Sequence, residues 1–195
     1  MSLTPAGERL LAAAAELFYR RGIRAVGVDL IAETAGTTKK TLYDCFGSKD
    51  ALVALYLEHR MGRWQAFLVE HMAPVQPGPE RIPAVYDALG VWLADADRGC
   101  GFVNAYAEIG GTGHPGEAVV RAEKAAMRRY FVQLATEDGL AEPERLGAEL
   151  HLLYEGASVM TTAGGVPDAV DHAREAARRL VHLAGPAVAE VPAPA

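Results

Sequence analysis

Cysteine, long apolar runs and targeting signals are scarce in this sequence. Two cysteines among 195 residues are too few for a disulfide framework, and neither belongs to a Cys-x-x-Cys pair. No apolar run reaches the roughly 18 residues that a membrane-spanning helix needs. The first residues, MSLTPAGERLL, carry no basic segment leading into an apolar stretch, which a signal peptide requires. We therefore expect a reduced, cytoplasmic protein with no membrane contact.

Signatures of catalysis and metal binding are also missing. The six histidines show neither HxxxH nor HExxH spacing, and neither cysteine has a second ligand at zinc-finger spacing. No GxSxG motif occurs, and the glycine-rich segment GGTGHPG (residues 110–116) lacks the Lys-Ser/Thr that follows in a phosphate-binding loop. We expect neither enzymatic activity nor a metal or cofactor.

Acidic residues outnumber basic ones, but unevenly along the chain. The formal net charge is -6, yet residues 1–50 hold seven Lys/Arg against six Asp/Glu, whereas residues 51–195 hold twelve against nineteen. Local clustering of cations, rather than total charge, decides whether a phosphate backbone is attracted. Any contact with nucleic acid is therefore expected in the first fifty residues.

The hydrophobic pattern predicts an all-α protein, because no segment shows sustained alternation with β-branched enrichment. Thr4 and Ser48 are expected to cap helices, and Gly22 to end one. Nine helices are expected, at about 4–21, 28–35, 38–45, 48–72, 79–97, 102–109, 116–138, 142–163 and 167–184. We expect a DNA-binding domain over 1–48, a ligand-binding and dimerisation domain over 49–185, and a disordered Pro/Ala-rich tail over 186–195.

Residues 28–46, VDLIAETAGTTKKTLYDCF, predict a helix-turn-helix. Ile31 on the first helix and Leu42 on the second are spaced to face each other, and Gly36 can adopt the positive φ of the turn. The second helix starts with hydroxyls and ammonium groups at its electropositive N-terminus, which suits a recognition helix in the DNA major groove. The residues expected to bind DNA here are Thr37, Thr38, Lys39, Lys40, Thr41 and Tyr43. A plain pair of packed helices with solvated lysines remains the alternative.

Residues 8–56 resemble the DNA-binding domain of the TetR family of transcriptional regulators, through LFYRRG, IA-x-x-AG, TLY-x-x-F and SKD-x-L. The resemblance implies three N-terminal helices for DNA, followed by a variable helical domain for a ligand and for dimerisation. It places Thr38, Lys39 and Thr41 over the groove and Tyr43 on the DNA backbone. It also implies that Lys49, at the start of the fourth helix, contacts a phosphate.

Four residues, at three places in the sequence, depart from the family pattern. Val26-Gly27 stands where a hydroxyl pair is common, so a hydroxyl cap and phosphate contact at the second helix are not expected. Lys40 replaces a frequent glycine and adds a cation, so the operator sequence is expected to differ from those of relatives. Cys45 replaces a frequent histidine and is expected to be a small buried residue.

The larger domain offers aromatic and apolar side chains among a few polar ones, as a ligand pocket requires. Each of these is also a candidate core residue, and His151 with Glu155 one turn later is also a candidate surface pair. The residues expected to bind a ligand are Trp64, Phe67, Trp92, Phe102, Tyr106, Met127, Tyr130, His151 and Tyr154.

The last two predicted helices are apolar and rich in small residues, which suits a four-helix bundle made by two subunits. Packing inside the subunit's own core is the alternative. The expected interface residues are Leu153, Ala157, Met160, Ala173, Ala177, Leu180 and Val181. A two-fold dimer would place two recognition helices on a palindrome with half-sites about 34–36 Å apart.

The sequence thus predicts a homodimeric repressor that leaves a palindromic operator when a small, largely apolar molecule binds. Two alternatives stay open. One is a ligand-independent architectural DNA-binding protein on the same fold. The other is a protein that sequesters a small molecule and no longer uses its DNA-binding head.

Overall fold

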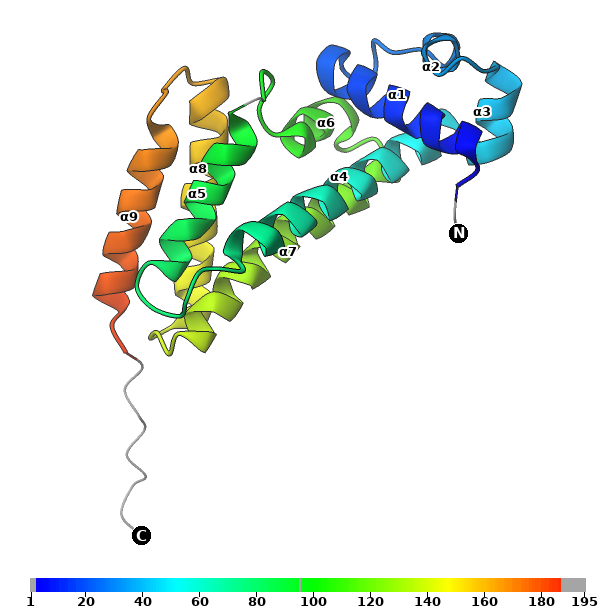
Figure 1. Ribbon diagram of the computed structural model, residues 1–195. Coiled ribbons are helices and arrows are strands. Elements are labelled where there is room, and N and C mark those ends of the chain that lie inside the picture. Colours follow the sequence, from blue (N-terminus) through cyan, green and yellow to red (C-terminus); the bar gives the residue numbers. More distant parts are fainter. Residues whose placement is uncertain (1–2, 95, 187–195) are drawn as a thin grey trace. The chain divides into compact units, whose positions relative to one another are not determined.

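The computed structural model describes residues 3–94 and 96–186, and within them the chain is helical, with no strand beyond an isolated bridge between Leu140 and Pro186. The all-α prediction is therefore confirmed. The helices of the described part are α1 (Pro5–Arg21), α2 (Val28–Thr34), α3 (Lys39–Phe46), α4 (Lys49–Met72), α5 (Arg81–Leu93), α6 (Gly101–Ile109), α7 (Gly116–Glu137), α8 (Pro143–Thr162) and α9 (Ala169–Ala184) (Figure 1). Residues 187–195 of the predicted tail lie outside the described residues.

Local capping signals set several helix ends where the sequence predicts them. The Thr4 hydroxyl accepts a hydrogen bond from the Gly7 N–H at 3.2 Å, and α1 ends at Gly22. The Ser48 hydroxyl accepts from the Ala51 N–H at 3.0 Å at the start of α4. None of the helices in the described part is both long enough and apolar enough to cross a membrane.

The fifth helix is shorter than predicted: α5 covers 81–93 rather than 79–97. Gly78 has a φ of 142° in the turn before the helix, which delays its start. At the other end the Ala96 N–H bonds to the Leu93 carbonyl at 2.9 Å, an i−3 contact that tightens the chain into a turn. Among the described residues of the predicted span 79–97, Leu93 is also the last buried apolar one, so apolar burial favours an end to the helix there.

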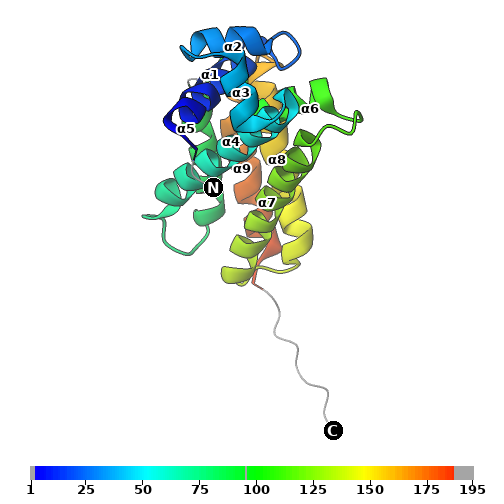
Figure 2. The same ribbon diagram turned by 90° about the vertical axis from the view of Figure 1, so that its right-hand side faces the viewer.

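The described chain forms two compact units. The first, which we call the head unit, comprises the residues up to Ala66 together with Cys100–Glu123. It contains α1, α2, α3, α6 and the first parts of α4 and α7. Its apolar core includes Leu10, Ile31 and Leu42 from the first three helices, and Figure 2 shows those helices grouped together. α6 adds Phe102 and Ala105 to the same core, so this late helix packs with the N-terminal ones.

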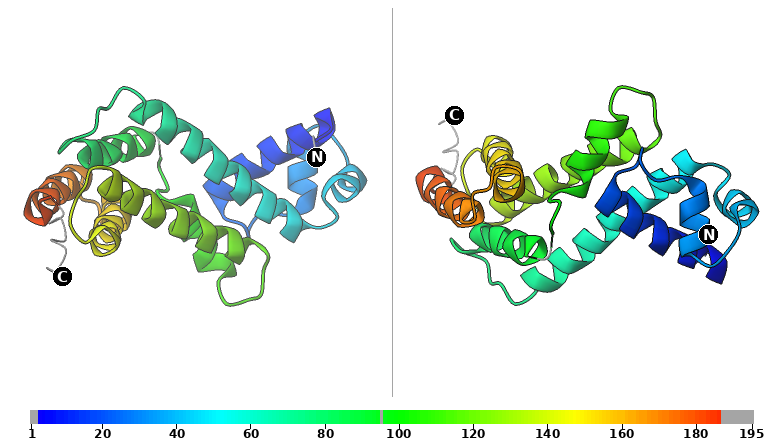
Figure 3. Two further views of the ribbon diagram at one scale, coloured as in Figure 1. Left: turned by 90° about the horizontal axis from the view of Figure 1, so that it is seen from below. Right: turned by 90° about the horizontal axis from the view of Figure 1, so that it is seen from above.

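The second unit, which we call the bundle unit, comprises Phe67–Gly99 and the described residues from Lys124 onward. α9 packs against both α5 and α8, and Figure 3 shows these three helices nearly end-on and side by side. Ala173 and Ala177 are buried on α9, where their small side chains permit close approach. Gly147 on α8 permits a close approach to α7, because a Cβ at this position would lie 2.8 Å from the backbone nitrogen of Val132.

Candidate nucleic-acid interface

α3 starts with a capped N-terminus. Thr38 precedes the helix in an extended conformation, and its hydroxyl accepts a hydrogen bond from the Thr41 N–H at 3.2 Å. The hydroxyls of Thr38 and Thr41 lie 2.9 Å apart. The helix ends at Gly47, whose φ is 74°. The free N–H groups of the first turn, together with the helix dipole, favour an anion at this end.

The two sides of α3 differ sharply. Leu42 is fully buried in the core that α1, α2 and α3 share. The opposite side is polar: Thr38, Lys39, Lys40 and Tyr43 are exposed, and Thr37 and Thr41 are half-buried. The structure therefore brings six of the seven side chains predicted to bind DNA together on α3 and the two residues before it.

Both lysines of α3 have acidic neighbours. The Lys39 ammonium lies 3.1 Å from the Asp29 carboxylate of α2, and the Lys40 ammonium lies 2.7 Å from that of Asp44. All four side chains are well exposed. Exposed ion pairs contribute only about 0–1 kcal/mol, so exchanging either carboxylate for a DNA phosphate costs little.

Lys49 lies apart from this group. Its ammonium donates a hydrogen bond to the Ile23 carbonyl at 2.6 Å and sits 5.9 Å from the centre of the Phe18 ring. Burial lowers the pKa of the Lys49 ammonium below its ordinary value, although the negative charges of Asp50 and Glu108 act in the opposite direction. The Lys49 side chain, predicted to contact a phosphate, is thus half-buried, with its ammonium on a backbone carbonyl of the head unit.

Glu108 on α6, which no sequence motif marks, holds the same segment after α1 that Lys49 contacts. One carboxylate oxygen accepts from the Ile23 N–H at 2.9 Å and the other from the Arg24 N–H at 2.7 Å. These residues form the connection between α1 and α2. The only sequence signal for this role is that Glu108 is the single charged residue in the apolar segment 101–109.

The start of α2 agrees with the predicted departure from the family pattern. Gly27 occupies the N-cap position, and no side chain caps the helix. Asp29 in the first turn instead complements the positive end of the dipole.

The residues predicted to bind a ligand are divided between the two units. Trp64, Phe102 and Tyr106 belong to the head unit, and Phe102 is part of its core. Tyr106 is 43 % exposed, and the Arg121 guanidinium lies 5.9 Å from the centre of its ring. The other six, in the bundle unit, are Phe67, Trp92, Met127, Tyr130, His151 and Tyr154.

Aromatic rings form the centre of the bundle unit. Tyr86, which the sequence analysis did not select, is fully buried with Phe131, and each ring contacts Tyr154 at a centroid distance of 6.3 or 5.9 Å. The Tyr86 hydroxyl donates to the Leu150 carbonyl at 2.7 Å, and burial raises its pKa. Phe67 and Trp92 form a second ring contact, at 5.2 Å.

A charged group borders these rings. One oxygen of Glu155 lies 2.9 Å from the Lys124 ammonium and 3.2 Å from the His151 Nε2. Burial opposes ionisation of Glu155, but the His151 hydrogen bond and the Lys124 charge outweigh it and hold the pKa below its ordinary value. Among the predicted polar residues, His151 is thus paired within the protein and in ring contact with Tyr154.

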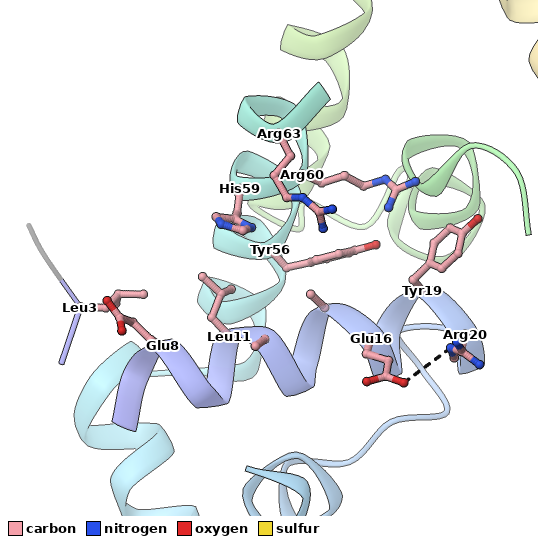
Figure 4. Close-up of a pocket in the computed structure, with 12 residues that line it drawn as sticks. Leu3, Glu8, Leu11, Glu16, Tyr19, Arg20, Tyr56, His59, Arg60 and Arg63 are labelled. Carbon is pink, nitrogen blue, oxygen red and sulfur yellow. Dashed lines mark ion pairs between the residues drawn. The ribbon is translucent and has the colours of Figure 1, made fainter. Parts of the chain in front are cut away.

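A cleft of about 690 Å³ lies between α1 and α4 of the head unit. Figure 4 shows Leu11 and Tyr19 of α1 facing Tyr56 and Arg60 of α4. The Arg60 guanidinium lies 4.6 Å from the centre of the Tyr19 ring. This cleft is lined by none of the nine residues predicted to bind a ligand.

The predicted interface residues also differ in exposure. Ala157, Ala173, Ala177 and Val181 are buried within the subunit, where α9 packs on α5 and α8. Leu153 and Leu180 are half-buried, and Met160 is 45 % exposed. Three further apolar side chains of α8 and α9 are exposed: Leu152, Val159 and Leu183.

Metal ligands do not cluster among residues 3–94 and 96–186: no group of three or more His, Cys, Asp or Glu side chains there is arranged to hold an ion. Both cysteines are half-buried and neither forms a disulfide, and the Cys45 sulfur lies 3.9 Å from the Thr4 hydroxyl oxygen. Cys45 is therefore less buried than the sequence predicts.

Residues 10–56 match the family model described as bacterial regulatory proteins, tetR family. The HTH-type transcriptional activator FasR of Mycolicibacterium smegmatis is 33% identical over 91 residues, which cover 47% of this chain and 42% of FasR. An uncharacterised HTH-type transcriptional regulator of Mycobacterium tuberculosis is 34% identical over 77 residues, 40% of this chain and 38% of that protein. The chain therefore aligns with less than half the length of these curated relatives.

Solved structures match over nearly the whole chain. A TetR-family transcriptional regulator from Streptomyces coelicolor has a TM-score of 0.81 and 29% identity, covering 90% of this chain and 95% of that one. A Streptomyces avermitilis protein described as a TetR transcriptional regulator has a TM-score of 0.74 and 30% identity, covering 89% and 98%.

Proposed function

The chain belongs to the TetR family of bacterial transcriptional regulators, and from this we propose that it is a repressor, not an enzyme, that binds a palindromic operator as a homodimer and leaves it when a small, largely apolar molecule binds. Because the proposed partner is chromosomal DNA, the proposed location is the cytoplasm. We propose residues 1–48 as the DNA-binding domain and residues 49–185 as the domain for ligand and dimerisation.

The polar side of α3 is the observation that carries this proposal. It presents hydroxyls and ammonium groups at a capped helix N-terminus, while Leu42 fixes the opposite side in the core. A helix of this kind enters the major groove with its first turns at the base edges. Thr38, Lys39, Lys40 and Thr41 would face bases or phosphates, and the exposed Tyr43 hydroxyl would meet the backbone.

Exposed apolar residues on α8 and α9 support the dimer. Leu152 is 73 % exposed and Leu183 is 78 % exposed, which is unfavourable for a lone subunit. Val159 and Met160 continue the apolar stripe from Leu152 at helical spacing. We propose that these four residues, with Leu153 and Leu180, form a four-helix bundle with the same helices of a second subunit.

The effector is proposed to bind through the larger domain. Its apolar and aromatic side chains, among them Trp92, Met127 and Tyr130, suit a largely apolar molecule. The Glu155 group with His151 supplies a polar partner at the margin of the buried rings. A difference of a few kcal/mol in DNA affinity between two states is enough to switch a promoter.

The first test is fluorescence anisotropy against DNA from upstream of the gene for this protein, at two salt concentrations and with excess competitor DNA. Binding that survives competitor at the higher salt is expected. Binding abolished by competitor and salt together reflects phosphate attraction alone and contradicts a specific operator at that place.

Two variants test whether α3 is the DNA-binding surface. Replacing Lys39 and Tyr43 by alanine should remove specific binding, whereas Arg129→Ala, an exposed cation on α7, should not. A promoter reporter in cells then decides the direction of regulation. Loss of reporter expression when the gene for this protein is deleted would contradict repression. It would indicate an activator, which is how its relative FasR is described.

A further inference from the structure

The first three residues after α1 are Gly22, Ile23 and Arg24. We call them the head loop. Charged side chains from two other helices hold its backbone. Glu108 of α6 accepts from the Ile23 and Arg24 N–H groups at 2.9 and 2.7 Å, and Lys49 of α4 donates to the Ile23 carbonyl at 2.6 Å. Both backbone polar groups of Ile23 are therefore bonded to ionised side chains, which form stronger hydrogen bonds than neutral groups do.

The backbone conformation of the head loop accommodates the Glu108 carboxylate. Gly22 has φ 91° and ψ 155°, a conformation that is nearly restricted to glycine. A Cβ at Gly22 would lie 2.9 Å from one oxygen of Glu108, so the close approach also requires a glycine. Ile23 and Val26, on either side of Arg24, are buried in the core of the head unit and anchor the head loop there.

The position of Lys49 is costly for a lysine. Its ammonium is half-buried over Phe18, where removal from water is unfavourable, instead of being extended into solvent. The Ile23 carbonyl and the nearby negative charge of Glu108 compensate for that loss of solvation. Such a side chain is poorly placed to reach a phosphate, but it is well placed to hold the loop.

We infer that Glu108 and Lys49 are positioning residues for DNA recognition: together they fix the head loop and thereby the orientation in which α2 and α3 are presented. Lys49 is in this view an internal brace rather than a phosphate contact. The inference rests on the proposed DNA-binding function and assigns that function two residues outside the helix-turn-helix.

The chain provides a matched control for Glu108. Glu117 at the start of α7 belongs to the same head unit, and one of its oxygens accepts from the Thr112 and Gly113 N–H groups at 2.9 and 2.8 Å. It clasps the loop between α6 and α7, not the head loop. Glu108→Gln and Glu117→Gln therefore remove the same charge in two different loops. The single amide oxygen of Glu117→Gln can still accept both N–H groups, so this variant controls for the loss of charge alone.

The experiment uses the full chain and duplexes that the wild type selects from a random pool. Against the selected site, Glu108→Gln should lose about tenfold or more in affinity, because an amide cannot accept both N–H groups. Binding to a non-specific duplex should change less than about twofold, since phosphate attraction is untouched. Glu117→Gln should match the wild type on both duplexes.

Two further readouts separate positioning from a general loss of stability. A site with one base pair inserted between its half-sites should be rejected less strongly by Glu108→Gln than by the wild type, because a loosened head tolerates altered spacing. Lys49→Gln should weaken specific binding while leaving the salt dependence unchanged, whereas loss of a phosphate contact would reduce the slope by about one.

Equal affinity and equal spacing preference in Glu108→Gln and the wild type would overturn the inference, as would a reduced salt slope in Lys49→Gln. If Glu108→Gln does not fold, Glu108→Asp replaces it, and its Ile23 and Arg24 amide resonances must shift while operator binding falls. Failure of the wild type to select any site would instead count against the proposed function, which keeps the two failures distinct.

Discussion

The head unit and the bundle unit use their charged side chains in different ways. In the head unit, Glu108 and Lys49 reach backbone groups of the head loop. In the bundle unit, charged side chains pair with one another, both along a helix and between helices, as Arg81 does with Glu137 and Asp138, and Arg178 with Glu80. Beneath those pairs lies a core of aromatic rings.

This difference suggests a division of labour. A side chain bonded to backbone fixes the path of the chain itself, which matters where a recognition helix must be presented accurately. A pair of exposed side chains fixes only two flexible groups and adds little free energy. The bundle unit is accordingly expected to draw its stability from apolar burial, and the head unit to draw its accuracy from a few directed hydrogen bonds.

The largest expected effect tests the core of the bundle unit. Phe131 is fully buried against Tyr86 and Tyr154, so Phe131→Ala should lower the free energy of unfolding by about 3–5 kcal/mol. Urea unfolding followed by circular dichroism measures the change. Val69→Ala, at an exposed position, is the control and should stay within about 0.5 kcal/mol of the wild type. Equal losses would remove the contrast between core and surface.

The next effect tests the shape of the head loop. Gly22→Ala should cost about 1–3 kcal/mol, because alanine strains the backbone there and its Cβ meets Glu108. Thermal unfolding gives the stability change, and anisotropy gives the accompanying loss of operator binding. Gly165→Ala has a positive φ of 64° but open space around it, so it should cost less and leave operator binding intact. A larger effect at Gly165 would contradict a special role for the head loop.

The third prediction concerns how the contribution of Glu155 to stability depends on pH. Glu155 is the half-buried carboxylate beside the aromatic rings of the bundle unit. The folded-state pKa of Glu155 is held below the ordinary value of 4.5, so its stabilisation is complete above that pH and is lost as the pH falls through the folded value. Glu155→Gln should therefore be less stable by about 1–2 kcal/mol near neutral pH. The difference from the wild type should shrink on acidification below 4.5, as urea unfolding at several pH values will measure. A difference that grows on acidification would reverse the assigned sign.

The smallest effect is expected at the exposed pairs of the bundle unit. Arg178 contacts Glu80 at 2.7 Å and also pairs with Glu175, with the acidic partners largely exposed. Arg178→Ala should cost about 0–1 kcal/mol, with a smaller difference at high salt. Differential scanning calorimetry at two salt concentrations checks this, and a loss comparable to that of Phe131→Ala would break the proposed division.

Local features of the fold could be predicted from the sequence because their causes are local. Thr4 and Ser48 cap helices that begin within three residues of them, and Gly22 ends α1 through its own backbone freedom. The six polar residues of α3 and its cap follow from one short pattern. The end of α5 was harder to place, since it depends on where buried contacts stop at Leu93.

Contacts between distant segments had no such signal. The Glu108 carboxylate and the Ile23 amide are 85 positions apart, and nothing in the local sequence pairs them. Lys49 occupies a position that resembles a phosphate contact, and only the folded chain shows its ammonium on the Ile23 carbonyl. Likewise, a helix rich in small apolar residues suits both a partner subunit and the subunit's own core, so Ala173 and Ala177 could not be assigned before α5 and α8 were placed beside them.

The acidic neighbours of Lys39 and Lys40 bear on how the protein searches a chromosome. In the proposed DNA-binding role, Asp29 and Asp44 reduce the net positive charge that Lys39 and Lys40 offer to an arbitrary duplex, so fewer counterions would be released when the helix touches one. A larger share of the molecules would then remain available to the proposed operator, instead of being held by the rest of the genome.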